Sequence, residues 1–108
     1  MGVRKDFVWG AATSAYQIEG TDPEDGRGKN IWDTFAEQGR IYDGQNADVA
    51  CDHMHRYKED FAMMRLLGVK AYRFSLNWAR ILPEGTGRVN EKAIALYRDM
   101  IKEMKKNG

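Results

Sequence analysis

The segment VKAYRFSLNW, residues 69–78, carries the strongest fold signal in the sequence. Large apolar side chains alternate along it with small or polar ones, which is the two-residue period of a β-strand. Both faces of this strand are expected to be buried. The large side chains suit packing under helices, and the small and polar ones suit the crowded interior of a barrel or the floor of a site.

Two amphipathic helices are expected on either side of this strand. From Asp48 to Leu67 the apolar positions are spaced four, three, four and three residues apart, and Gly68 is placed to end this helix: Ala50, Met54, Tyr57, Phe61 and Met64. After the strand, Asn90 is expected to cap a second helix with a similar stripe: Ile94, Tyr97, Ile101 and Met104.

A first short strand is expected over residues 7–12. Residues 21–29 have the composition of turns, residues 31–35 predict a single helical turn, and residues 39–45 predict another loop. The resulting order is strand, loop, helix, strand, loop, helix, which predicts an α/β fold with parallel strands and no internal domain boundary. Two parallel strands alone leave at least one sheet edge and one helix face without partners.

Composition narrows the classes of function. The chain has 108 residues, with 17 Lys and Arg against 16 Asp and Glu, so it forms one ordinary domain at most and has no charge pattern for nucleic acid. A mean hydropathy of −0.66 without a long apolar run predicts no membrane span. The N-terminus lacks the apolar core of a secretory signal and Cys51 is the single cysteine, so a cytoplasmic location is expected.

Two polar residues are candidates for a functional site. Arg73 lies on the interior face of the strand, where a guanidinium needs acceptors to offset the loss of water. Its partner is either Glu19, in a structural pair, or a catalytic carboxylate outside this chain whose pKa it would lower. Gln17 follows the first strand, where its amide suits either a bidentate contact to sugar hydroxyls or an ordinary loop hydrogen bond.

Other candidates fit a site less well. His53 and His55 point to different sides of a helix, and Cys51 with His55 gives too few ligands, so neither a metal nor a cofactor is expected. Residues 26–29, GRGK, lack the glycine spacing of a phosphate-binding loop. No two carboxylates are clearly placed for acid and base catalysis. Three aromatic side chains fit either a sugar-stacking surface or, more commonly, a core: Trp9, Trp32 and Trp78.

The segment FVWGAATSAYQIEG, residues 7–20, resembles the N-terminal signature of glycoside hydrolase family 1, the β-glucosidases and their relatives. Further segments are similar to this family in the same order: IWDTF at 31–35, DVACDH at 48–53, HRYKED at 55–60, AYRFS at 71–75 and RILPEG at 80–85. The likeness covers nearly the whole chain. The sequence differs from the common family residues at positions 21–22, Met54 and Ala79, so it does not indicate which sugar is preferred.

The resemblance implies a (β/α)8 TIM barrel, typically about 250 residues or more, of which this chain would carry the first two βα units. It also implies that Gln17 hydrogen-bonds the glycone and that Arg73 contacts the nucleophilic glutamate. The two catalytic glutamates of the family lie in motifs on later strands, which do not occur here, so no carboxylate of this chain takes either role. The complete site would use a retaining double displacement.

Two hypotheses follow. In the first, residues 1–108 are the N-terminal portion of a single β-glycosidase barrel, inactive alone and active with a complementary chain that carries the remaining βα units. In the second, the chain is a non-catalytic βαβα module that self-associates through its open edge, with weak sugar binding through Gln17 and the tryptophans.

Overall fold

The computed structural model describes residues 2–108 and confirms the expected alternation of strands and helices. Three short helical segments add to the expected elements. In chain order the elements are β1 Gly10–Ala12, α1 Ala15–Ile18, α2 Ile31–Glu37, the 3-10 turn η1 Tyr42–Gly44, α3 His53–Leu66, β2 Ala71–Arg73, α4 Trp78–Ile81 and α5 Glu91–Lys106.

The two strands form a parallel pair, as predicted. Gly10 lies opposite Ala71 and Ala12 lies opposite Arg73, and the N–H of Thr13 extends the ladder by donating to the oxygen of Arg73 at 2.9 Å. Both strands are shorter than the segments 7–12 and 69–78 that the sequence predicted. Neither strand has a second partner within residues 2–108, so both outer edges of the pair are open.

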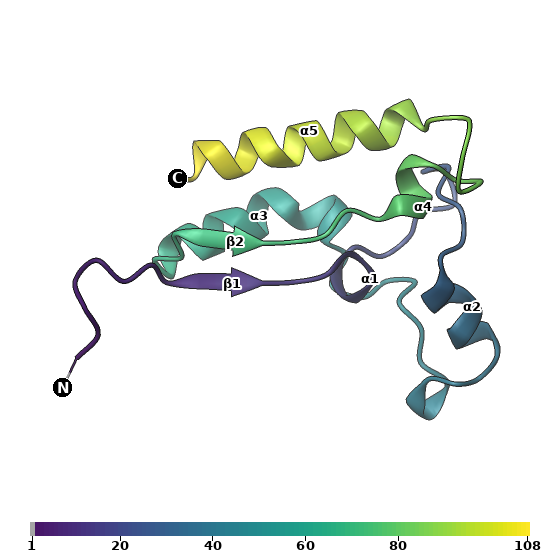
Figure 1. Ribbon diagram of the computed structural model, residues 1–108, viewed down its shortest axis with the longest axis horizontal. Helices are drawn as coiled ribbons and strands as arrows, with labels where there is room; N and C mark the ends of the chain where they lie inside the picture. Colours follow the sequence, from purple (N-terminus) through teal and green to yellow (C-terminus); the bar gives the residue numbers. More distant parts are fainter. Residues whose placement is uncertain (1) are drawn as a thin grey trace.

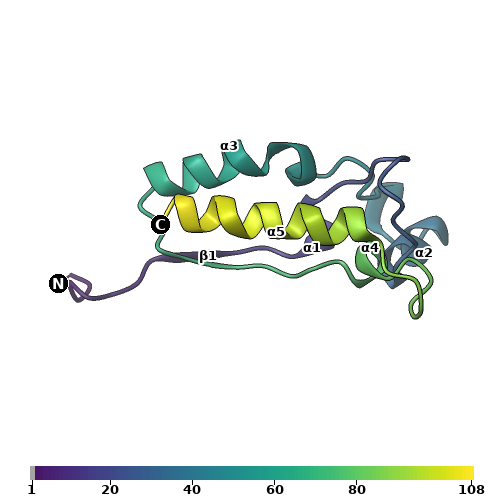
Figure 2. The same cartoon turned by 90° about the horizontal axis from the view of Figure 1, so that it is seen from above.

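The two long helices lie side by side next to the strand pair (Figure 1, Figure 2). Both run opposite to the strands, and the loop segments with α2 gather at the carboxyl ends of the strands (Figure 1). The core is an apolar cluster between α3, α5 and β2. Its buried members are Met54, Phe61, Tyr97 and Met100, and its partly buried members are Tyr57, Met64, Tyr72, Ile81, Leu96 and Met104.

Helix α3 begins later than the apolar spacing predicted. Ala50 and Asp52 have φ angles of 49° and 53°, in the left-handed region, which an α-helix cannot include. Ala50 is therefore not part of the apolar stripe, and the helix begins at His53. Its end agrees with the prediction, because Gly68 has φ 78° and the next residue's N–H donates to the oxygen of Met64 at 3.0 Å.

Helix α5 begins after Asn90, as predicted, but the side chain of Asn90 does not cap it. Instead the Asn90 amide donates to the oxygen of Asp25 at 2.8 Å, which ties the loop after β1 to this helix. Tyr97 faces the core as expected. Ile101 is exposed, and Met100 takes the buried position next to it.

The alternation of residues 69–78 holds only in part. Tyr72 packs against the core, but Leu76 is exposed and Trp78 is 67% exposed, whereas Asn77 is buried. The chain leaves the extended conformation here because Asn77 caps α4, its side-chain oxygen accepting from the N–H of Ala79 at 3.1 Å.

Candidate functional site

Gln17 lies in the single helical turn α1, directly after β1. The hydroxyl of Ser14 donates to Gln17 Oε1 at 2.7 Å, and the N–H of Ala15 donates to the hydroxyl of Ser75, beyond β2, at 2.8 Å. Gln17 itself is exposed. The turn thus presents the Gln17 carboxamide at the carboxyl end of β1.

Arg73 ends β2 and lies opposite the last residue of β1. The alternative in which it pairs with Glu19 is wrong, because Glu19 binds Arg80, with Arg80 Nε 3.1 Å from Glu19 Oε2. The side chain of Arg73 is exposed rather than buried on an interior face. Gln17 and Arg73 therefore belong to the same end of two neighbouring parallel strands, the end at which enzymes of α/β barrels place their sites.

The three tryptophans are all exposed, so none of them forms the core of this chain. Trp32 is the one next to the Gln17 turn. Its ring stacks on that of Tyr16, with centroids 5.9 Å apart and planes at 25°, and meets Phe35 edge-on. Trp9 precedes β1 and lies at the opposite end of that strand, and Trp78 begins α4. Trp32 is therefore placed, through Tyr16, to contribute an aromatic surface near Gln17.

The loop after β1 is held by an ion pair rather than shaped as a phosphate site. Arg27 donates to both carboxylate oxygens of Asp33, at 2.7 and 3.0 Å. Asn30 and Asp33 form a capping box that begins α2. Burial opposes ionisation of Asp33, but the hydrogen bonds from Arg27 and from the N–H of Asn30 lower its pKa. Arg27 is thereby engaged within the loop.

A buried polar network lies next to the turn, and the sequence reasoning missed it. Glu19 Oε1 accepts from the hydroxyl of Tyr97 at 2.7 Å, and Glu19 Oε2 accepts from Arg80. Arg80 is 1% exposed and also pairs with Asp25. Burial raises the pKa of Glu19, while the Tyr97 hydrogen bond and the Arg80 charge oppose that shift. The one signal in the sequence was a tyrosine within an apolar stripe, because a buried hydroxyl needs a partner.

The histidines are engaged with carboxylates along α3. His53 Nδ1 lies 2.7 Å from Asp60 Oδ2, and His55 Nδ1 lies 2.6 Å from Asp52 Oδ1. The hydrogen bond to Asp52 raises the pKa of His55. Within residues 2–108 no three His, Cys, Asp or Glu side chains are grouped to hold a metal ion. Over the same residues, no helix has both the length and the apolar character to cross a membrane.

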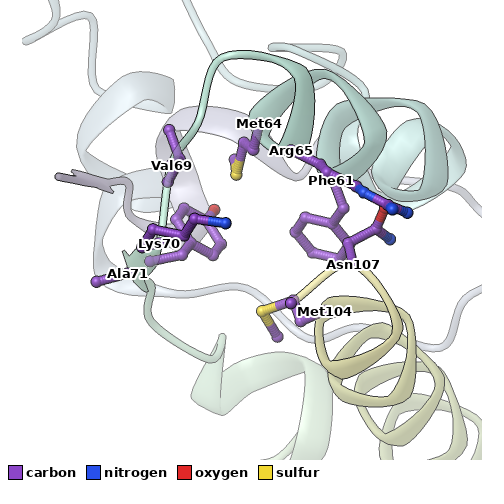
Figure 3. A pocket seen from close by; sticks show the side chains of 10 residues that line it. Phe61, Met64, Arg65, Val69, Lys70, Ala71, Met104 and Asn107 are labelled. Carbon is purple, nitrogen blue, oxygen red and sulfur yellow. The ribbon is translucent and has the colours of Figure 1, made fainter. Parts of the chain in front are cut away.

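A cavity of about 140 Å³ lies between the C-terminal ends of α3 and α5 and the beginning of β2 (Figure 3). Its walls combine apolar and polar side chains: Phe61, Met64 and Met104 face the opening, and the Lys70 side chain extends toward it (Figure 3). The cavity is at the amino end of β2, whereas Gln17 and Arg73 are at the carboxyl ends. It is therefore separate from the candidate site.

The chain is similar to proteins of known activity over its whole length. It is 53% identical over 105 residues to Beta-glucosidase A of Acetivibrio thermocellus, covering 96% of this chain and 23% of that protein. It is 51% identical over 112 residues to Beta-glucosidase A of Thermotoga maritima, covering 100% and 25%. With Beta-glucosidase 4 of Oryza sativa subsp. japonica the identity is 56% over 104 residues, covering 94% and 22%. The chain spans about a quarter of the length of these relatives.

Solved structures of β-glucosidases also match this chain over about a quarter of their own length. A family 1 β-glucosidase from Thermotoga maritima superposes with a TM-score of 0.90 at 50% identity, covering 98% of this chain and 25% of the other. The AHE enzyme from Alicyclobacillus herbarius gives a TM-score of 0.91 at 48% identity, covering 99% and 24%. The profile of Glycosyl hydrolase family 1 matches residues 2–108. The chain belongs to glycosyl hydrolase family 1.

Proposed function

We propose that this chain is the N-terminal portion of a retaining β-glycosidase that hydrolyses β-linked glucosides and related glycosides. The observation that carries the proposal is the position of Gln17 and Arg73 at the carboxyl ends of β1 and β2, in a chain of this family. The Thermotoga maritima β-glucosidase, which superposes on this chain, is known in complex with a substituted glucoimidazole.

In this proposal the two residues have different roles. Gln17 hydrogen-bonds hydroxyls of the glycone, because a carboxamide offers both a donor and an acceptor in one plane. Arg73 contacts the nucleophilic glutamate and holds it ionised, because a nearby positive charge lowers the pKa of a carboxyl group. Both side chains are exposed, so both are accessible to groups from outside this chain.

The two catalytic carboxylates come from the remainder of a (β/α)8 barrel, of which this chain supplies the first two βα units. Among residues 2–108 Glu19 is the one buried carboxylate, and both of its oxygens are engaged by Tyr97 and Arg80. The open outer edges of β1 and β2 offer unpaired backbone groups that further strands would pair with. The partner is therefore a polypeptide that carries the remaining βα units, and the chain alone is inactive.

The test combines this chain with a polypeptide that carries the remaining six βα units and measures hydrolysis of an aryl β-glucoside. Turnover by the complex and by neither part alone is the expected result. Arg73→Met should lower kcat/KM by about a hundredfold or more without preventing assembly, since it removes a positioned charge from the site. Arg98→Met, an exposed arginine on α5, is the matched control and should leave activity within twofold. A complex that forms but does not turn over the glucoside would overturn the proposal.

The second candidate function is a non-catalytic βαβα module that self-associates. Several large apolar side chains are exposed, which favours burial against another surface: Val8, Trp9, Leu66, Leu67, Leu76 and Trp78. Sedimentation of the 12.4 kDa chain alone distinguishes the two. A stable homo-oligomer that does not exchange for the complementary polypeptide supports the module, and a chain that assembles only with that polypeptide supports the glycosidase.

We also propose a cytoplasmic location. Cys51 is exposed and unpaired, and it is the single cysteine of the 108 residues, which fits a reducing compartment. Cell fractionation with an antibody to this chain tests the location, and recovery from an oxidising compartment would contradict it.

A further inference from the structure

The turn that carries Gln17 is fixed at both of its ends. At the beginning of the turn, the N–H of Ala15 donates to the hydroxyl of Ser75 at 2.8 Å. At its end, Glu19 closes the turn by donating its N–H to the oxygen of Ala15 at 2.9 Å. Gln17 lies between these two ends and is itself exposed. Its position relative to β1 and β2 therefore depends on how firmly the ends are held.

Glu19 is held by three different helices. Its carboxylate accepts from Tyr97 on α5 at 2.7 Å and from Arg80 on α4 at 3.1 Å. Its backbone oxygen accepts from the N–H of Met54 on α3 at 3.3 Å. Arg80 Nη2 also donates to the oxygen of Gly20, the following residue, at 3.0 Å. The end of the turn is thus tied through both side chain and backbone.

These contacts are buried, so the loss of any one of them lowers the free energy of unfolding substantially. Glu19 is 4% exposed and Arg80 is 1% exposed. Rotation of the turn would leave a buried carboxylate and guanidinium without partners, and a buried unpaired charge is strongly destabilising. The structure therefore allows the turn one arrangement relative to α4 and α5.

Tyr97 on α5 is itself held in place by contacts of its ring and of its hydroxyl. Its ring is part of the buried core, and its hydroxyl accepts from the N–H of Asn77 at 2.9 Å while donating to Glu19. Figure 1 places α1, α4 and the beginning of α5 at the same end of the molecule. Through Tyr97 the core between α3 and α5 sets the position of the turn.

We propose that Glu19, Arg80 and Tyr97 are positioning residues for Gln17, and that they hold its carboxamide where it meets the glycone. This inference rests on the proposed function, in which Gln17 binds substrate. The three residues do not touch substrate themselves; they act through the turn. A displacement of about 1 Å in a binding group can cost up to about a hundredfold in rate, so loss of one anchor should be measurable.

The test is a double-mutant cycle in the complex with the remaining barrel, with an aryl β-glucoside as substrate. Tyr97→Phe removes the hydroxyl that donates to Glu19 and accepts from the N–H of Asn77, and it should lower kcat/KM by about tenfold, mostly through KM. In a Gln17→Ala background the same substitution should change kcat/KM by less than about twofold, since residues that act through each other are not additive. Equal losses in both backgrounds, or no loss in either, would overturn the inference.

Tyr57→Phe is the matched control. Tyr57 packs against the same core from α3, and its hydroxyl has no hydrogen-bond partner in the part of the chain described by the structure. This substitution should leave kcat/KM within twofold in both backgrounds. A loss as large as that of Tyr97→Phe would assign the effect to core packing and contradict the inference.

Hydrogen exchange on the 108-residue chain provides a readout that does not depend on activity. Tyr97→Phe should speed exchange at the amides of residues 17–20 by about tenfold, and also at the Asn77 amide, which loses its acceptor. The middle of α3 should be unchanged, because none of its hydrogen bonds involves the Tyr97 hydroxyl. Arg80→Lys keeps the charge but cannot reach all three of its acceptors, and it should act in the same direction.

Uniform acceleration over the whole chain, or no change at residues 17–20, would overturn the inference. An inactive wild-type complex would overturn the proposed function instead, and the exchange pattern would still decide whether the anchor exists.

Discussion

Replacement of Arg80 by methionine tests the buried network most directly. Arg80 is 1% exposed and donates to Glu19, to Asp25 and to the oxygen of Gly20. Methionine fills much of the same volume but makes none of these hydrogen bonds, so Glu19 is left as a buried carboxylate without its cationic partner. Removal of one partner of a buried ion pair costs about 3–5 kcal/mol.

That cost is a large part of the stability of a small domain, which totals about 5–15 kcal/mol. With a urea dependence of about 1–3 kcal/mol per molar, the midpoint of urea unfolding should fall by more than about 1 M. The control is Arg98→Met on α5, where the arginine is exposed and the change should stay within about 0.5 kcal/mol. Circular dichroism of the 108-residue chain follows both transitions.

The loss of unfolding free energy in Arg80→Met should also depend on pH, because the substitution changes the pKa of Glu19. Burial raises the pKa of Glu19 above its ordinary value of 4.5, and the positive charge of Arg80 opposes that shift. Without Arg80 the pKa of folded Glu19 rises further, so the folded variant binds a proton more tightly than the unfolded chain does. The free energy of unfolding of the variant therefore falls as the pH rises above about 4.5.

The difference between wild type and Arg80→Met should accordingly be smaller at pH 5 than at pH 7.5. Adding Glu19→Gln to the variant should remove this pH dependence, because no titrating carboxylate remains at that position. A loss no larger than that of Arg98→Met, or a difference that widens toward acid pH, would refute the reasoning.

Three further changes test other parts of the chain by urea unfolding. Gly28→Ala should cost about 1–3 kcal/mol, because the new Cβ would lie 1.9 Å from a backbone oxygen of the loop after α4, whereas Gly2→Ala meets nothing within 4 Å and should be neutral. His55→Asn should remove a contribution that is present below about pH 6.5 and lost as pH rises through the folded-state pKa, since the hydrogen bond to Asp52 raises the pKa of His55; an unchanged pH profile would contradict this. Asn30→Ala should cost about 1 kcal/mol through loss of the α2 cap, and a change below about 0.3 kcal/mol would show that the cap is dispensable.

The elements with long apolar stripes were predictable from the sequence, but their exact beginnings were not. The periodicity of α3 and α5 follows from burial of one face, which any stable packing requires. The start of α3 depends on left-handed backbone at Ala50 and Asp52, which apolar spacing does not report. The change from strand to helix at Asn77 was missed for a similar reason, because residues 76–78 continue the alternation by chance.

The candidate site was predictable where it lies close to a strand end and unpredictable where it depends on contacts across the fold. Gln17 and Arg73 each follow from their place at the carboxyl end of a strand. The partner of Glu19 could not be predicted from the sequence, because Arg73 and Arg80 are both arginines at a plausible distance along the chain. Only the turn into α4 brings Arg80, rather than Arg73, against the Glu19 carboxylate.

The buried polar groups around Glu19 find their hydrogen-bond partners within this chain, whereas many of its apolar side chains are not covered by it. Both carboxylate oxygens of Glu19 have donors, and these donors come from within the 108 residues. In contrast, Trp9 is 59% exposed and Leu66 is 88% exposed, so much apolar surface has no cover within the described chain. A polar network that is complete can hold the Gln17 turn before any further polypeptide packs against it, since its contacts need no outside group. In the proposed function, this chain therefore sets the geometry of the Gln17 turn by itself, and the rest of the barrel supplies the catalytic carboxylates and covers the exposed apolar surface.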